Sequence, residues 1–271
     1  MASVPNVLKN IIPIITFMMN DWEAIIKDTG MKQTQLQTVR EQLADTAIGM
    51  GARFFGTADL TGAVETIVEQ GGDYLSAYLR ALSIGIAMAD GIMDQLPRHK
   101  EIGVARTYDY LYYTVNRSLD RIALRLSVIL NTNGFTSFLI PASDKIDNEK
   151  MQGLFSHKLA ARLAGLGWIG PSCLLITPEA GPRVRWVTVL TDALLEPGEP
   201  MESQCGDCRK CVDACPPKAF TGRYFDPSEH RDARFIVQRC DDYRRHLKNK
   251  VTGTRTCGMC VHVCPFGRGD M

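Results

Sequence analysis

Eight of the nine cysteines fall within the last 67 residues of this 271-residue chain, and their spacing constrains the fold more than any other feature. The stretch CGDCRKCVDACPP contains the first four, which are Cys205, Cys208, Cys211 and Cys215. The second four are Cys240, Cys257, Cys260 and Cys264. The last cysteine of each set precedes a proline, and the two-residue gaps let thiolates converge on one cubane. The spacing therefore predicts two 4Fe–4S clusters.

In two-cluster ferredoxins the fourth cysteine of a run binds the other cluster. We therefore expect one cluster to be bound by Cys205, Cys208, Cys211 and Cys264. We expect the other to be bound by Cys215, Cys240, Cys257 and Cys260, with a 16-residue insertion, 241–256, inside this site. Zinc is the alternative, but four-cysteine zinc sites use paired CxxC knuckles rather than a triple run closed by proline. Two neighbouring clusters carry single electrons, so a terminal acceptor is implied.

The rest of the chain has the composition of a globular protein, with 45% hydrophobic and 23% charged residues. The stretch LEPGEP (195–200), which is rich in proline and glycine, predicts a boundary between domains 1–200 and 201–271. Apolar periodicity and stop signals predict helices over 33–51, 108–134 and 148–166. Strands are predicted over 51–60 and 135–140, a β-hairpin over 173–192, and a buried segment of either type over 76–96.

The charge is distributed unevenly along the chain. Residues 203–271 carry 13 Lys or Arg against 8 Asp or Glu, and the remainder carries 18 against 22. A basic C-terminal part suits an acidic electron donor such as ferredoxin or flavodoxin, although a solvated face would show the same excess. The most basic run, RRHLKNK (244–250), could meet such a donor. Only Tyr243 supplies an aromatic ring there, which argues against binding of transfer RNA.

Cysteines at ligand spacing indicate a reducing compartment, so we expect a cytoplasmic protein. The apolar segment IIPIITFMM (11–19) is short and interrupted by Pro13, so neither a signal peptide nor a transmembrane segment is expected. The body contains no GxGxxG after a strand, no Walker A sequence, no HExxH and no DxHxxG-type cobalamin ligand. Residue patterns alone therefore leave the electron acceptor open.

The stretch HKLAARLAGLGWIGPSCLLITPEAGPRVRWVTVLTDALLEPGEP (157–200), together with the cysteine runs, resembles the core of epoxyqueuosine reductases and reductive dehalogenases. AGLGWIG (164–170) looks like the former, whereas 177–200 and NGFTSFLIPASDK (133–145) look closer to the latter. The resemblance covers residues 133 to 271. One departure is that Pro171, Ser172 and Cys173 replace the Lys-Asn-Thr that usually follows W-I-G in epoxyqueuosine reductases, which puts the substrate in doubt.

The resemblance implies an α/β (α+β) protein with a nitroreductase-like core followed by a ferredoxin-like domain. It implies an oxidoreductase in which the clusters reduce a base-off cobalamin for reductive cleavage of a small substrate. An electron-transfer protein that reduces a partner's corrinoid or other cofactor is the alternative. A homodimer is left open.

Candidate site residues follow from the same resemblance. Candidate cofactor-binding residues are Lys158, Arg162, Gly165, Gly167, Trp168 and Gly170, the glycines permitting close backbone approach. A tight turn would explain the glycines equally well, and a solvated helix face would equally explain Lys158 and Arg162. Candidate catalytic residues are Asp109, Tyr110 and Asp144, with a tyrosine or aspartate as proton donor. Tyr108 and Tyr112 lie on the apolar stripe of their helix and are expected in the core, as is the lone Cys173.

Overall fold

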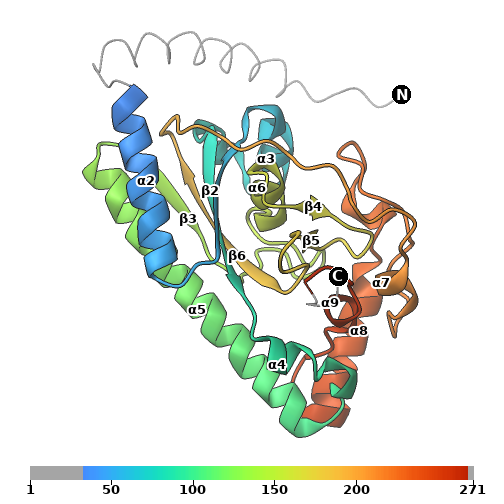
Figure 1. Ribbon diagram of the computed structural model, residues 1–271. Helices are drawn as coiled ribbons and strands as arrows, with labels where there is room; N and C mark the ends of the chain where they lie inside the picture. The colour runs from blue at the N-terminus through green and yellow to red at the C-terminus, as the bar shows by residue number, and fades with distance from the viewer. Residues whose placement is uncertain (1–32, 268–271) are drawn as a thin grey trace, which may run out of the picture.

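The computed structural model describes residues 33–267, so the apolar segment 11–19 lies outside the described residues. Its centre is a four-stranded antiparallel sheet with the order β1-β2-β6-β3 (Figure 1). The strands are β1 (Phe54–Asp59), β2 (Arg80–Ala87), β3 (Ser137–Ile140) and β6 (Val184–Thr191). Strand β6 pairs with both β2 and β3, and its side chains are buried almost throughout. The chain therefore has a mixed α and β fold organised around β6.

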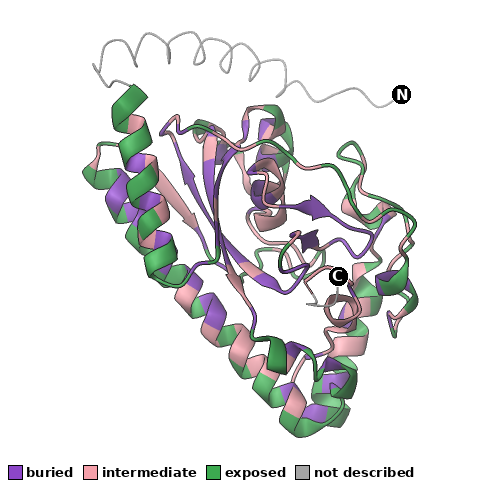
Figure 2. Ribbon diagram, in the orientation of Figure 1, coloured by how far each residue is buried: buried purple, intermediate pink, exposed green. Residues whose placement is uncertain are grey.

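Helices α2 (Gln33–Gly49) and α5 (Ile102–Thr132) cover one face of the sheet (Figure 1). Along α5, Val115, Leu119, Ile122 and Leu126 recur at helical spacing and pack with Leu82 of β2. The outer faces of both helices are exposed (Figure 2). Gly134, which follows the helix, has a φ of +86°, the left-handed conformation that ends many helices.

Helix α6 (His157–Leu163) covers the opposite face, and α3 (Val64–Gly71) packs beside it. The Ser156 side chain accepts a hydrogen bond from the Leu159 amide and caps α6. His157 joins the helix to the sheet, because its Nδ1 lies 2.8 Å from Thr188 Oγ1 and its Nε2 lies 3.0 Å from the Pro141 carbonyl oxygen. Burial lowers the pKa of His157 to about 4, so the ring is neutral at physiological pH.

A two-stranded sheet, β4 (Trp168–Ile169) with β5 (Leu175–Ile176), lies between the main sheet and the cysteine-rich part (Figure 1).

The remaining described helices are α4 (Asp90–Met93), α7 (Lys210–Asp213), α8 (Val237–His246), α9 (Met259–His262) and a π-helix (Leu247–Thr252). Short 3₁₀ turns span Thr61–Ala63, Asp73–Ala77, Leu96–Arg98 and Arg231–Ala233. The C-terminal part contacts the start of α5, where Thr256 Oγ1 donates to the Ala105 carbonyl at 3.1 Å. Among the described helices, none combines the length and apolar character of a membrane span.

The helices predicted over 33–51 and 108–134 and the strands over 51–60 and 135–140 are confirmed, with boundaries shifted by a few residues. The segment 76–96 divides into β2 and the short α4. The helix predicted over 148–166 is wrong for its first half, because α6 begins only at His157 after an irregular loop. The hairpin predicted over 173–192 is also wrong, since β5 pairs with β4 while β6 pairs with β2 and β3.

Candidate cluster site and adjoining cavity

The structure brings the eight clustered cysteines together in two groups. Burial, together with the neighbouring thiols of Cys205, Cys208 and Cys211, raises the pKa of Cys264 to about 11. In the other group, the half-buried Cys260 interacts electrostatically with Cys215, Cys240 and Cys257. Cys260 also interacts with Cys211 of the first group, so the groups adjoin. The fourth cysteine of each run therefore lies with the other run, the arrangement that a two-cluster ferredoxin requires.

Within residues 33–267, no group of three or more Cys, His, Asp or Glu side chains is placed so as to hold one metal ion. A zinc ion needs its four ligands within about 2.3 Å, whereas each thiolate of a cubane binds a different iron atom and the sulfurs lie further apart. All nine cysteines are free, with no disulfide among them.

The hairpin formed by β4 and β5 separates the first cysteine group from the main sheet. Side chains alternate across it, so Trp168 and Ile176 contact the cysteine side while Ile169 and Leu175 pack against the sheet. Trp168 Nε1 donates a hydrogen bond of 3.2 Å to Cys205 Sγ. Its ring lies edge-on to Phe266 with centroids 4.9 Å apart.

On the sheet side of this hairpin the structure has a cavity of about 1060 Å³. It is bounded by the end of β3, the loop 142–156, α6, the hairpin and the segment 225–234 of the cysteine-rich part. Seven lysine or arginine side chains and four carboxylates line it, so its lining is basic. Ile169 and Cys173 of the hairpin line the cavity, whereas neighbouring Ser172 hydrogen-bonds to Cys211. One short loop thus contacts both the cavity and the first cysteine group.

A network of polar side chains forms the wall beneath α5. Tyr112 Oη lies 3.0 Å from Ser143 Oγ, and the Arg185 guanidinium lies 4.2 Å from the centroid of the Tyr112 ring. Arg185 Nε donates to Asn116 Oδ1 at 3.0 Å, and Ser143 and Arg185 both line the cavity. Burial raises the pKa of Tyr112, but the Arg185 cation and hydrogen bonds to Ser143 and Asn116 outweigh it, so the net pKa is lowered. Tyr112 was expected in the core, and the structure instead places its hydroxyl beside Ser143 of the cavity lining.

Three of the predicted site residues line the cavity, namely Asp144, Lys158 and Arg162. Gly165, Gly167, Trp168 and Gly170 do not line it. A Cβ on Gly165 would lie 2.4 Å from the Glu199 carbonyl oxygen, and one on Gly167 would lie 2.1 Å from that of Ile176. A Cβ on Gly170 would lie 2.4 Å from Ile176 Cδ1. These glycines therefore permit close approach of the protein's own chain, as the turn explanation predicts.

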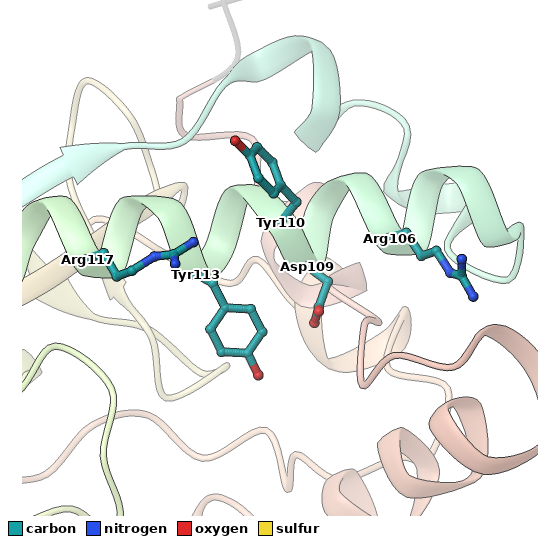
Figure 3. Close-up of a pocket in the computed structure, with 5 residues that line it drawn as sticks. All are labelled: Arg106, Asp109, Tyr110, Tyr113 and Arg117. Carbon is teal, nitrogen blue, oxygen red and sulfur yellow. The ribbon is translucent and has the colours of Figure 1, made fainter.

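Asp109 and Tyr110 lie on the outer side of α5, away from the large cavity. With Arg106, Tyr113 and Arg117 they line a shallow depression of about 450 Å³, all five from one helix (Figure 3). Tyr110 is 69% exposed and Tyr113 is 55% exposed. The helical period explains this placement, since Tyr112 and Tyr110 are two residues apart and project about 200° apart around the helix axis. The structure thus places Tyr110 at the surface and Tyr112 beside Ser143, which lines the large cavity.

Comparison with known proteins agrees with the resemblance seen in the sequence. A family profile described as a 4Fe-4S double cluster binding domain matches residues 204–267. Epoxyqueuosine reductase of Bacillus anthracis is 33% identical over 140 residues, which are 49% of this chain and 36% of the relative. Tetrachloroethene reductive dehalogenase of Sulfurospirillum multivorans is 36% identical over 114 residues, 40% of this chain and 23% of the relative. The chain thus spans about a third or less of the length of these curated relatives.

Solved structures of both groups share the fold. An epoxyqueuosine reductase with an epoxyqueuosine-modified tRNA-Tyr stem loop has a TM-score of 0.55 at 20% identity, covering 86% of this chain and 66% of that one. A catabolic reductive dehalogenase in complex with 3-bromo-4-hydroxybenzoic acid has a TM-score of 0.58 at 19% identity, covering 84% and 32%. The predicted relationship to epoxyqueuosine reductases and reductive dehalogenases, which are oxidoreductases by name, is confirmed.

The indole N–H of Trp168 should tune the cluster that the first cysteine group would bind. Trp168→Phe removes the hydrogen bond to Cys205 Sγ but keeps the aromatic packing on Phe266. Hydrogen bonds to ligand sulfur stabilise the more negative, reduced cluster, so we expect its midpoint potential to fall by about 30–60 mV. A redox titration followed by electron paramagnetic resonance would measure this, with the second cluster as internal control. Equal shifts in both clusters would contradict the assignment.

Proposed function

We propose that this chain is a corrinoid-dependent iron–sulfur reductase, which passes single electrons from two 4Fe–4S clusters toward the large cavity for reductive cleavage of a small substrate. The observation that carries the proposal is the loop between β4 and β5. The Ser172 side chain forms a hydrogen bond with Cys211 on one side of the loop, and Cys173 lines the cavity on the other side. Electrons would therefore have only this loop to cross.

The proposed cluster ligands follow the two groups seen in the structure. One cluster would be bound by Cys205, Cys208, Cys211 and Cys264, and the other by Cys215, Cys240, Cys257 and Cys260. We also propose that the chain divides near residue 200 into the body and the cluster-binding part. Thiolates that bind iron must remain reduced, so the protein is proposed to work in the cytoplasm.

The residues around the cavity fit a base-off corrinoid. Its volume of about 1060 Å³ lies at the upper end of ordinary ligand sites, about 300–1,000 Å³. The histidine that lines it from α6 cannot serve as a cobalt ligand without losing its bonds, because both ring nitrogens of His157 already have partners. A corrinoid bound there would supply a cobalt centre that accepts single electrons and breaks a bond of the substrate. Lys158, Arg162 and Arg185 would hold its polar side groups.

Reductive replacement of a leaving group by hydrogen consumes two electrons and one proton, so the site needs an acid. Tyr112 is the proposed donor, because its pKa is lowered by Arg185 and its hydroxyl bonds to Ser143 on the cavity wall. Asp144 lines the same cavity and stays a candidate for orienting the substrate. The bound leaving group departs with the electron pair of the cleaved bond, and the carbon takes the proton.

The proposed electron donor is an acidic ferredoxin or flavodoxin. Arg244, whose charge acts on both Cys240 and Cys257, lies in the basic run beside the second cysteine group. An acidic partner there would approach the second cluster and be attracted by the surrounding cations. An electron-transfer protein without a substrate of its own is the alternative, and the cavity, whose wall contacts Tyr112 through Ser143, favours the enzyme.

An RNA-borne substrate is a second candidate, because the structure supplies aromatic rings that the sequence argument lacked. Tyr110 and Tyr113 are exposed on α5 between two arginines (Figure 3). Asp109, beside them, interacts with Arg244 and Lys248 of the basic run, so the two surfaces adjoin. One solved relative holds a tRNA stem loop. The expectation against transfer RNA is therefore not supported.

Reconstitution tests the main proposal. The full chain, purified anaerobically and supplied with iron and sulfide, should contain about eight iron atoms from two 4Fe–4S clusters. Added hydroxocobalamin should bind with a base-off absorption spectrum and a stoichiometry of about one. A preparation that holds both clusters and binds no corrinoid would reject the enzyme and leave the electron-transfer alternative.

Tyrosine-to-phenylalanine variants, which remove one hydroxyl group each, test the assignment of Tyr112 as the proton donor. Tyr112→Phe should lower turnover about 10²–10⁴-fold with corrinoid binding retained, whereas Tyr110→Phe should change it less than about threefold. Release of bromide from 3-bromo-4-hydroxybenzoic acid, the ligand of the related dehalogenase, is the assay. Activity of the unaltered protein should decline as pH rises through the lowered pKa of Tyr112, because the donor is then deprotonated. Greater loss in Tyr110→Phe would restore the first assignment.

Stem-loop binding tests the second candidate. Fluorescence anisotropy with a tRNA-Tyr stem loop should show binding that weakens about 5- to 100-fold in Tyr110→Ala or Tyr113→Ala, as expected when a stacked base loses its platform. Tyr224→Ala, which removes another exposed tyrosine from the cluster-binding part, is the matched control. Absence of binding at low salt would remove RNA from consideration.

A further inference from the structure

One wall of the cavity gathers cations around a single aromatic ring. The Arg162 guanidinium of α6 lies 5.0 Å from the centroid of Phe225, and that of Arg234 lies 4.6 Å from the same centroid. Lys158, one helical turn before Arg162, lines the same cavity. The wall therefore joins two cations of the body with one from the segment between the two cysteine runs. We call Lys158, Arg162, Phe225 and Arg234 the cationic wall.

Arg234 is the most deeply buried member of the cationic wall. It is only 5% exposed, and its Nε has no hydrogen-bond partner within the described residues. Its Nη2 reaches only the Glu229 carbonyl oxygen, at 3.5 Å. A buried guanidinium with unused donors is unfavourable, because the lost hydration is not replaced. An acceptor that enters the cavity would remove this cost.

The contrast with Arg183 shows how this chain treats a buried guanidinium elsewhere. Arg183 is 3% exposed, and its Nε, like that of Arg234, has no hydrogen-bond partner within the described residues. Its two Nη atoms, however, donate to the carboxylates of Asp90 and Asp94 at 2.8 and 2.7 Å. Over residues 33–267, by contrast, Lys158, Arg162 and Arg234 form no ion pair with a carboxylate. The charge of Asp226 acts on Arg234 without reaching ion-pair distance, so the compensation at this wall is weaker than at Arg183.

The carboxylates near the wall are already engaged. Glu229 pairs with Arg223, which does not line the cavity, and Asp232 pairs with Arg231. Lys158 Nζ donates to the Cys173 carbonyl oxygen at 2.7 Å, a neutral acceptor. Burial lowers the pKa of Lys158, and the nearby cations of Arg231 and Arg234 lower it further. Like charges that lie this close in a partly enclosed cavity repel one another, so an anion is the missing component.

We propose that the cationic wall binds a phosphate group of the molecule that occupies the cavity, with Arg234 and Arg162 as its principal donors. Guanidinium groups present paired N–H donors that match the oxygens of phosphate, and Phe225 holds both in place. The proposal rests on the proposed function in one respect, since the phosphodiester of a cobalamin nucleotide loop is one source of the phosphate. A phosphorylated or phosphodiester-containing substrate is the other source.

Paired corrinoids distinguish the two sources. Binding of cobalamin and of cobinamide, which lacks the nucleotide loop and its phosphate, would be measured by absorbance titration of the reconstituted full chain. If the cofactor supplies the phosphate, Arg234→Gln should weaken cobalamin binding about 10- to 100-fold and change cobinamide binding less than about threefold. Lys150→Gln removes an exposed cation from the same cavity outside the wall and should leave both affinities unchanged.

Inorganic phosphate tests the other source. With the chain loaded with cobinamide, millimolar phosphate should raise the thermal midpoint of the unaltered protein and of Lys150→Gln, and should not raise that of Arg234→Gln. This outcome, with equal effects on both corrinoids, would assign the wall to the substrate. The iron content shows whether Arg234→Gln still binds its clusters. If it does not, each measurement is repeated with Arg162→Gln.

The proposal is overturned if cobalamin and phosphate both bind the wall variants as they bind the unaltered protein. Failure of the proposed function is a separate result. If no corrinoid binds the unaltered chain, the phosphate measurement is made on the reconstituted protein alone. A shift that depends on Arg234 would then support the anion site even without a corrinoid, and the absence of any shift would reject both.

Discussion

The contact between the β4–β5 hairpin and the first cysteine group is the interaction on which the rest of the structure depends. Because side chains alternate along a strand, Trp168 reaches Cys205 while the adjacent Ile169 packs on the sheet side. Two residues thus connect a cluster-binding segment to the sheet core. The same hairpin forms part of the cavity wall, so in the proposed function its position would determine the distance between the first cluster and the cavity. Glycines at 165 and 167 allow this by letting the chain pass against its own backbone.

The parts of the fold that were predictable from sequence are those encoded locally. The apolar stripe of α5 reports a structure that forms from neighbouring residues. Most cysteines of each group are also close in sequence, although Cys264 and Cys215 each lie with the other run. The hairpin predicted over 173–192 failed because β6 pairs with β2, about a hundred residues earlier, and no turn signal encodes that choice. The helix predicted before His157 failed because residues 147–152 form a local bridge instead.

The candidate site was predictable only where a residue type has a single use. Cysteines at ligand spacing have one, and they form the two expected groups. Tyrosines do not, and the apolar stripe of α5 did not indicate which of them would contact the residues that line the cavity. Tyr112 belongs to that stripe, yet its hydroxyl lies beside Ser143 and its ring lies beneath Arg185. These partners lie on other elements, so only the tertiary structure shows that a cation and hydrogen bonds lower the pKa of this half-buried tyrosine.

The unpaired cations of the cavity bear on why the body and the cluster-binding part form a single site. Elsewhere the chain pairs a buried charge with side chains of opposite charge. Two carboxylates pair with the buried Arg183, and Arg245 and Arg255 pair with the buried Asp241. Arg162 of the body and Arg234 of the cluster-binding part meet on one ring, Phe225, so both parts contribute to the same basic wall. A ligand with negative charge would bring these parts together, whereas an empty cavity leaves like charges facing each other. Binding of such a ligand and docking of the cluster-binding part are therefore expected to stabilise each other, because each supplies what the other lacks.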